Sequence, residues 1–207
     1  MNPKKDFSIS EALAFGWDVT QKNFFLILSL LVVAFLGPSL VSKLAGLVRD
    51  TFPIFALLLD LGGWVLGVIL QIGLVNVSLK FADGKKPRMA DLFSTYPMFF
   101  NYLLASIIYG LIVLAGTILL IVPGVVWAIQ FWPYVYVLVG KKVGVLESLD
   151  RSSKMTAGVK GQLFLFLLAL LGINLLGALA LAVGLLVSIP VTMVASAWVY
   201  RRLSDRL

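Results

Sequence analysis

The stretch TILLIVPGVVWAIQFWP, residues 117–133, places a proline and a glycine inside a long apolar run. No charged residue occurs between Asp91 and Lys141, so this run is too long for a single helix across a bilayer. Pro123 lacks the N–H that a continuing helix needs, and Gly124 tolerates the backbone angles of a tight turn. We therefore predict a helical hairpin that turns at Pro123 and Gly124. A proline kink inside one tilted helix is the alternative.

The composition favours lipid as the solvent of this chain. Of the 207 residues, 60% are hydrophobic and 13% are charged, about half the charged share of a typical soluble domain. A helix needs about 20 mostly apolar residues to cross a bilayer. Charge-free runs of that length or more predict an all-α polytopic membrane protein with about six transmembrane helices. We expect one membrane domain, 1–207, with spans near 23–42, 61–79, 102–122, 125–140, 162–182 and 184–200.

The distribution of basic residues predicts the orientation. Lys and Arg accumulate on the cytoplasmic side of membrane proteins. With six spans and a cytoplasmic N-terminus, Lys43 and Arg49 are the two of the 17 basic residues that face outside. We therefore expect a multi-pass protein of the plasma (inner) membrane with both termini in the cytoplasm.

Three stretches on the expected cytoplasmic side have helical spacing of apolar residues. They are SISEALAFGWDVTQ (8–21), PRMADLFSTYPMFF (87–100) and VLESLDRSSKMT (145–156), and each precedes two spans. Ser8 and Glu11 have the spacing of a capping box. We expect short interfacial helices, the first over 8–21, each followed by a hairpin. Ordinary loops with helical turns are the alternative.

The residue types that usually carry catalysis are missing. The chain has no histidine and no cysteine, which excludes Ser-His-Asp and Cys-His sites and the usual nitrogen and sulfur metal ligands. Glycine-rich phosphate loops are absent as well. We expect no enzyme, no catalytic residue, no cofactor and no metal site.

A few polar residues lie within or beside the predicted spans. Asp60 either stabilises the start of the second span as a helix N-terminal carboxylate or belongs to a polar pathway. The amides either line that pathway or bond between helices, which is the commoner role. The candidates for the pathway are Asp60, Gln71, Asn76, Gln130 and Asn174.

The net charge of +7 arises mainly from the expected cytoplasmic loops. Such a face attracts anionic lipid headgroups, whereas scattered basic residues without interleaved aromatics do not predict nucleic-acid binding. The candidates for headgroup contact are Lys85, Lys86, Arg88, Lys141, Lys142, Arg151, Lys154, Arg201 and Arg202.

Several motifs together resemble a known family. They are GW (16–17), QKNFF (21–25), FADGKKPRMADLFS (81–94), LLIVPGVVWAIQFWPYV (119–135) and GVLESLDRSSKMTAGVKGQLFLF (144–166). From about residue 8 to 203, the chain resembles prokaryotic integral membrane proteins of unknown function. It is also similar to the membrane domain in front of some glycerophosphoryl diester phosphodiesterases. The resemblance implies a polytopic helical protein of a bacterial or archaeal plasma membrane, and it carries over no catalytic residue.

Two functions agree with these observations. The first is a non-enzymatic membrane protein, an accessory or organising factor that contacts lipids or other membrane proteins. The second is a small-solute or ion transporter or channel that uses Asp60 and the intramembrane amides.

Overall fold

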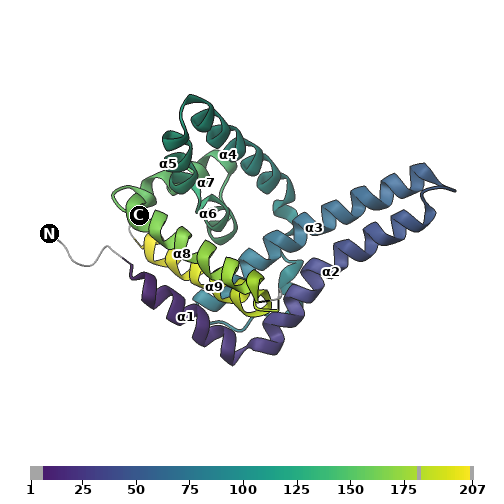
Figure 1. Cartoon of the computed structure of the whole chain (residues 1–207). Helices are drawn as coiled ribbons and strands as arrows, with labels where there is room; N and C mark the ends of the chain where they lie inside the picture. The colour runs from purple at the N-terminus through teal and green to yellow at the C-terminus, as the bar shows by residue number, and fades with distance from the viewer. Residues whose placement is uncertain (1–6, 181–182, 206–207) are drawn as a thin grey trace.

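The computed structural model describes residues 7–180 and 183–205. Within these residues the regular elements are helices and no strand occurs, which confirms the predicted all-α class. The elements are α1 (Ile9–Lys22), α2 (Phe24–Val48), α3 (Pro53–Ala82), η1 (Met89–Leu92), η2 (Tyr96–Met98), α4 (Phe99–Leu119), α5 (Ile121–Phe131), α6 (Tyr134–Lys141), α7 (Val145–Thr156), α8 (Lys160–Leu179) and α9 (Leu185–Ser204). In Figure 1, the α2–α3 and α4–α5 hairpins project in different directions from a body that contains α9.

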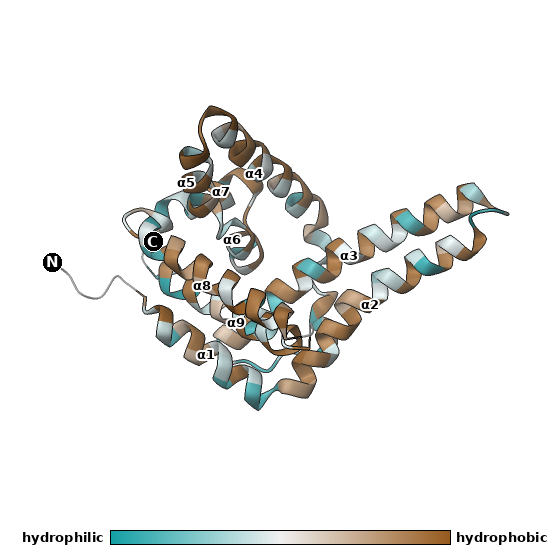
Figure 2. Cartoon of the chain, in the orientation of Figure 1, coloured by the Kyte–Doolittle hydropathy of each residue, from teal (hydrophilic) through white to brown (hydrophobic). Residues whose placement is uncertain are grey.

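Five helical stretches among the described residues are long and apolar enough to cross a membrane. They are Phe24–Val48, Pro53–Ala82, Met89–Leu119, Ile121–Lys141 and Lys160–Leu179. Figure 2 shows that most residues of α4, α5 and α8 are hydrophobic. A helix that is apolar all round is buried in protein or lies in lipid. The large side chains at the α4–α5 tip are 68% to 76% exposed, so the chain is a polytopic helical membrane protein.

The sixth predicted span, 184–200, forms α9 and is not among these five stretches. Its hydroxyl side chains and the arginines of its last turn make it less apolar than the others. It is packed inside the protein, against α1, α3 and α8. Gly184 caps the N-terminus of α9, close to the turn expected between the predicted spans 162–182 and 184–200. Residues 181–182, at the end of the predicted span 162–182, lie outside the described residues.

The α2–α3 hairpin is longer than predicted. The predicted spans ended at 42 and began again at 61, but α2 continues to Val48 and α3 begins at Pro53. The 30 residues of α3 extend about 45 Å. Charged residues end an apolar run without ending a helix, and a proline is well tolerated at the first position of a helix. Lys43 and Asp60, which we predicted to lie in the loop of the hairpin, are therefore part of α2 and α3.

The α4–α5 hairpin exists, but its turn lies three residues before the predicted one. The chain reverses at Leu120, which has extended backbone angles (φ −165°, ψ 150°). Pro123 and Gly124 lie in the first turn of α5, where a proline costs no hydrogen bond. A second proline, Pro133, separates α5 from α6, so the predicted span 125–140 is not one straight helix.

The three amphipathic stretches have different structures. The first forms α1 over Ile9–Lys22, and Ser8 caps it by accepting a hydrogen bond from the Glu11 N–H at 3.3 Å. Its buried residues, Ala12, Gly16 and Thr20, recur every four positions, and α1 packs on α9. The second stretch forms the short 3-10 turns η1 and η2, and the third forms α7.

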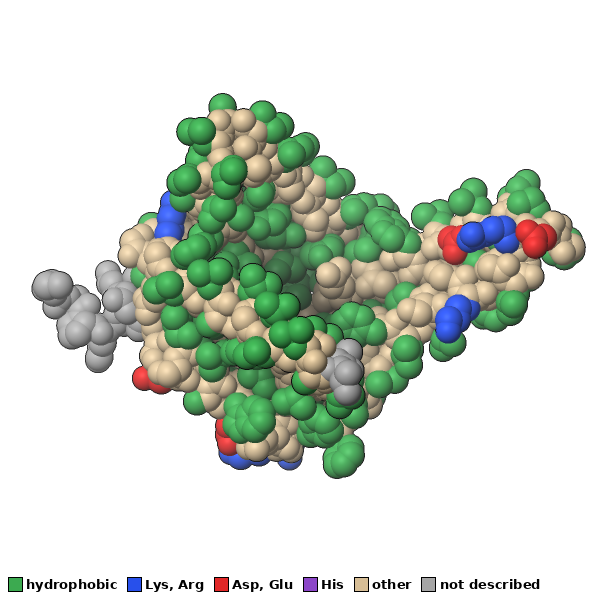
Figure 3. All heavy atoms as spheres, in the orientation of Figure 1, with side chains coloured by type: hydrophobic (Ala, Val, Ile, Leu, Met, Phe, Trp, Pro, Cys, Tyr) green, Lys and Arg blue, Asp and Glu red, His purple; other side chains and the backbone are tan. Residues whose placement is uncertain are grey.

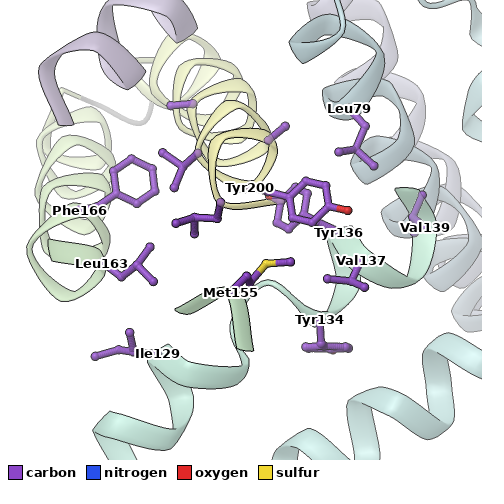
Figure 4. Close-up of a cluster of buried hydrophobic side chains, with 14 of the residues drawn as sticks. Leu79, Ile129, Tyr134, Tyr136, Val137, Val139, Met155, Leu163, Phe166 and Tyr200 are labelled. Atoms are coloured by element: carbon purple, nitrogen blue, oxygen red, sulfur yellow. The ribbon is translucent and has the colours of Figure 1, made fainter. Parts of the chain in front are cut away.

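One of two clusters of buried hydrophobic side chains gathers around Tyr200. Figure 4 shows Tyr136 beside Tyr200, with Met155, Leu163 and Phe166 on neighbouring elements. The rings of Tyr136 and Tyr200 stack with centroids 5.6 Å apart. This cluster joins α6, α7 and α8 to α9 and fixes one end of the cavity described next.

Candidate functional site

A cavity of about 620 Å³ lies where α2, α3, α6, α8 and α9 meet. This volume is within the range of small-molecule sites. Figure 3 shows the molecule hollowed near its centre, between α3 and the α8–α9 hairpin. Most of the lining is apolar and includes Leu31, Phe35, Leu74, Leu170, Ile189 and Met193. We call this space the central cavity.

The polar side chains of the central cavity are all uncharged. They are Gln71, Ser78, Tyr136, Asn174, Thr192 and Ser196, and no charged residue occurs among the described residues of the lining. Two of the five pathway candidates, Gln71 of α3 and Asn174 of α8, therefore meet in one cavity. Because an unpaired charge in such surroundings is costly, the cavity suits an uncharged ligand.

The serine and threonine hydroxyls of the cavity donate to their own helices, and the Tyr136 hydroxyl is hydrogen-bonded to Ser196. Ser78 donates to the Leu74 carbonyl at 2.6 Å, and Ser196 donates to the Thr192 carbonyl at 2.7 Å. Thr192 donates to the Ser188 carbonyl at 2.9 Å. Each hydroxyl has one proton, so these three oxygens offer the cavity acceptor lone pairs alone.

The amide of Asn174 is held by acceptors on two helices. Its Nδ2 donates to the Leu170 carbonyl at 3.0 Å and to Thr192 Oγ1 at 3.2 Å. The Leu170 carbonyl can only accept, so the end of the amide beside it carries the nitrogen. Asn174 Oδ1 is buried and accepts no hydrogen bond from any residue that the structure describes.

Asp60 lies in a groove next to the central cavity. It is in the second turn of α3 rather than at the helix N-terminus, because α3 already begins at Pro53. Its carboxylate accepts from Arg49 at 2.6 Å, across the α2–α3 hairpin. The groove has a volume of about 580 Å³ and shares Gln71 with the central cavity. Asp60 thus takes part in an ion pair, in place of the capping role that we considered.

The other two pathway candidates bond elsewhere. Asn76 Nδ2 donates to the Asp91 carbonyl at 3.2 Å and to Ser94 Oγ at 3.0 Å, and so holds the segment that follows α3. Gln130 Nε2 donates to Ser153 Oγ at 2.6 Å, and its Oε1 accepts from Lys160 at 2.5 Å. These amides connect elements and do not line the central cavity.

Four of the six polar residues that line the cavity were not predicted from the sequence: Ser78, Tyr136, Thr192 and Ser196. The sequence does contain a signal for two of them. Ser188, Thr192 and Ser196 recur every four residues in one predicted span and therefore lie on one helix face. Small hydroxyl residues are common in membrane helices, so the spacing did not separate a site from ordinary packing.

A second candidate site is a cluster of cations where α3, α6 and α9 end. A Cβ on Gly140 of α6 would lie 3.3 Å from Leu79 Cδ1 and 3.2 Å from the Tyr200 hydroxyl. Arg201 forms a two-pronged ion pair with Asp83, at 2.7 and 2.9 Å. We call this region the basic end and assign to it Lys85, Lys86, Arg88, Lys141, Lys142, Arg201 and Arg202.

The structure divides the nine headgroup candidates into two groups. Four of them already pair with carboxylates: Lys85 and Arg201 with Asp83, Arg151 with Glu147, and Lys154 with Asp150. Arg202 packs on the Trp198 ring at 4.9 Å. Within the described part of the chain, Lys86, Arg88, Lys141, Lys142 and Arg202 form no ion pair.

Metal-binding side chains do not cluster in the part of the chain that the structure describes. Among residues 7–180 and 183–205, no group of three or more His, Cys, Asp and Glu side chains could hold a metal ion. The chemistry that the central cavity offers is hydrogen bonding in apolar surroundings, and that of the basic end is attraction of anions.

Comparison with known proteins gives a family match over part of the chain. No curated protein and no solved structure matches it. Nothing links the chain to glycerophosphoryl diester phosphodiesterases, whose membrane domain its motifs resemble. Residues 117–207, from the α4–α5 turn to the C-terminus, match a family described as a protein of unknown function (DUF975), and the chain is similar to that family over these residues.

Proposed function

We propose that this protein is a non-enzymatic membrane protein that contacts anionic lipids at its basic end and serves as an accessory or organising factor for other membrane proteins. In this proposal it lies in the plasma (inner) membrane of a prokaryote, with the basic end and both termini in the cytoplasm. The small number of basic residues expected outside supports this orientation. The lack of histidine and cysteine throughout the sequence supports a role without catalysis.

The observation that carries the proposal is the set of cations at the basic end that form no ion pair with any residue that the structure describes. Lys141, Lys142 and Arg202 lie where three helix C-termini meet, and the partial negative charge of those termini offsets part of their charge. A basic residue near an anionic membrane surface contributes about 1 kcal/mol of attraction. The remaining positive charge, next to lipid-facing helices, suits phosphate headgroups.

Native mass spectrometry of the solubilised protein tests this proposal. We expect phosphatidylglycerol to bind more tightly than phosphatidylcholine. Replacing Lys141, Lys142 and Arg202 by Gln should reduce this preference at least about tenfold, because three screened attractions are lost. The control replaces Lys22, Arg151 and Lys154, which already pair with carboxylates, by Gln. An equal loss in both triple variants, or none in either, would contradict the proposal.

Transport of a small solute or ion is a second candidate, favoured by one face of α3. Asp60, Gly63, Gly67, Gln71 and Ser78 recur at helical spacing and line first the groove and then the central cavity. This face extends about 27 Å, close to the thickness of the hydrocarbon core.

Flux measurements in proteoliposomes test this second candidate. Asp60→Asn should reduce a measured solute or ion flux, while Asp50→Asn, in the loop after α2, should leave it unchanged. Fluxes that are identical in the unaltered protein, in Asp60→Asn and in protein-free vesicles would eliminate transport.

We also propose a relationship with the membrane domain in front of some glycerophosphoryl diester phosphodiesterases. The segment ESLDRSSKMTAGVKG (147–161), which covers most of α7, the loop after it and the start of α8, supports it. The relationship concerns the membrane fold and transfers no hydrolase activity. A structure of such a domain with α7-, α8- and α9-like helices in the same arrangement would support it, and a different helix order would refute it.

A further inference from the structure

We propose that Lys160 binds the phosphate of an anionic phospholipid whose acyl chains occupy the two apolar grooves on either side of α5. The site lies on α5 and α8 and uses none of the residues of the basic end, so the inference goes beyond the function proposed above. It follows from a cation that no described carboxylate balances, from the protons that this cation has left to donate, and from the grooves that end beside it.

Lys160 is a half-buried cation that is held by a neutral amide. Its Nζ donates to Gln130 Oε1 at 2.5 Å, and Gln130 Nε2 donates in turn to Ser153 Oγ at 2.6 Å. Lys160 forms no ion pair with any residue that the structure describes. The two acids of α7, Glu147 and Asp150, pair with basic residues of the same helix. Because a charge that is partly removed from water is costly without an opposite charge, this position favours an anionic ligand.

The ammonium group of Lys160 is available to such a ligand. It carries three protons and donates one to Gln130, so two remain for the oxygens of a phosphate. Lys160 is also partly exposed. It is the first residue of α8, a helix that is long and apolar enough to cross a membrane. The cation therefore lies at the end of a span, which is the depth of the lipid headgroups.

Two apolar grooves end beside this cation. One groove, of about 580 Å³, lies between α4 and α5, and Gln130 lines it at the end nearest Lys160. The other groove, of about 250 Å³, lies between α5 and α8. Phe164, one turn after Lys160 on the same face of α8, lines this second groove. Both grooves therefore lead away from Lys160 along α5.

The grooves decide the body of the ligand. Their rims are open to lipid, because Leu111 of the first groove and Leu171 of the second are 60% and 64% exposed. A free phosphate ion or an acidic peptide would balance Lys160 but leave the grooves unfilled. A phospholipid has one phosphate and two alkyl chains, which match one cation and two grooves. Phosphatidylcholine brings its own cation, so a headgroup with a net negative charge suits Lys160 better.

Fluorescence quenching by brominated lipids tests the inference on the full chain in phosphatidylcholine vesicles. One protein keeps Trp127 and Trp132, which line the two grooves, and a reference protein keeps only Trp64 of α3; the other tryptophans are replaced by Phe. At the grooves, dibrominated phosphatidylglycerol should reach half-maximal quenching at about fivefold lower mole fraction than dibrominated phosphatidylcholine. At Trp64 the two lipids should quench equally. Equal quenching at the grooves, or the same preference at Trp64, would overturn the inference.

Variants of the Lys160–Gln130 pair locate the phosphate. Gln130→Glu places a carboxylate beside Lys160 with almost no change in side-chain size. Both this variant and Lys160→Gln should abolish the preference for phosphatidylglycerol at the grooves, whereas Lys160→Arg keeps the cation and should retain it. Retention of the preference in Lys160→Gln or in Gln130→Glu would overturn the role of Lys160. If Lys160→Gln does not fold, Gln130→Glu still decides whether the uncompensated charge binds the lipid.

Two controls separate this site from other sources of anion binding. Replacing Lys141, Lys142 and Arg202 by Gln alters the basic end and should leave the preference at Trp127 and Trp132 unchanged. Loss of the preference in that variant would assign it to the basic end and overturn a separate site. Inorganic phosphate in place of chloride, at equal ionic strength, should also leave the preference unchanged. Its loss in inorganic phosphate would overturn a lipid as the source of the phosphate.

Discussion

At the scale of single residues, Gly116 of α4 and Gly124 of α5 allow the tip of the α4–α5 hairpin to close. A Cβ on Gly124 would lie 2.2 Å from Thr117 Oγ1 and 2.8 Å from the Thr117 backbone nitrogen. The backbone atom cannot rotate away, so the two helices would have to separate. The sequence predicted a turn from Pro123 and Gly124 but placed it three residues late, because a proline in a first helical turn and a proline in a loop look alike in sequence.

We expect Gly124→Ala to destabilise the protein by about 1–3 kcal/mol, the usual cost of overfilling a close contact. The measurement is reversible unfolding in mild detergent. Gly110→Ala, in the middle of α4, is the control: nothing lies within 4 Å of its added Cβ, and alanine favours helix. A Gly124→Ala protein as stable as Gly110→Ala would show that the helices do not touch at this position.

At the scale of elements, α1 is attached to α9 through a face of small residues. A Cβ on Gly16 would lie 2.4 Å from the Val191 carbonyl oxygen and 3.2 Å from the Ala195 Cβ. The sequence predicted α1 to within one residue at each end, since Ser8 and the apolar spacing mark it. It did not predict that α1 packs on α9. Small residues identify the face of a helix that can pack closely, but they do not identify the helix that packs against it.

Gly16→Ala should therefore loosen α1 from α9 while the rest of the protein stays folded. We expect amide hydrogens of α1 to exchange at least about fivefold faster, because the local opening free energy falls by an overpacking cost of about 1–3 kcal/mol. Hydrogen-exchange mass spectrometry measures this. Gly161→Ala, with open space around the added Cβ, should leave the exchange of α1 unchanged. Unchanged exchange in Gly16→Ala would refute the contact.

At the scale of the whole molecule, apolar composition predicts the medium and most helices, whereas packing determines the sites. Gln71 and Asn174 are about a hundred positions apart in the sequence, and they share a cavity because α9 packs on both α3 and α8. Asn76 and Gln130 have the same chemistry and bond elsewhere. The charged residues between 43 and 60 do mark the end of an apolar run. They do not mark the ends of α2 and α3, as we predicted, because a helix can continue beyond the bilayer.

The central claim is that α2 and α3 cross a membrane with the basic end inside, and cysteine labelling in intact cells tests it most directly. The chain has no cysteine, so single replacements can be labelled without background. Asp50→Cys, in the loop between α2 and α3, should react with a membrane-impermeant maleimide in intact cells. Lys86→Cys, at the basic end, should react only after the cells are permeabilised. Labelling of Lys86→Cys in intact cells, with Asp50→Cys protected, would contradict the account.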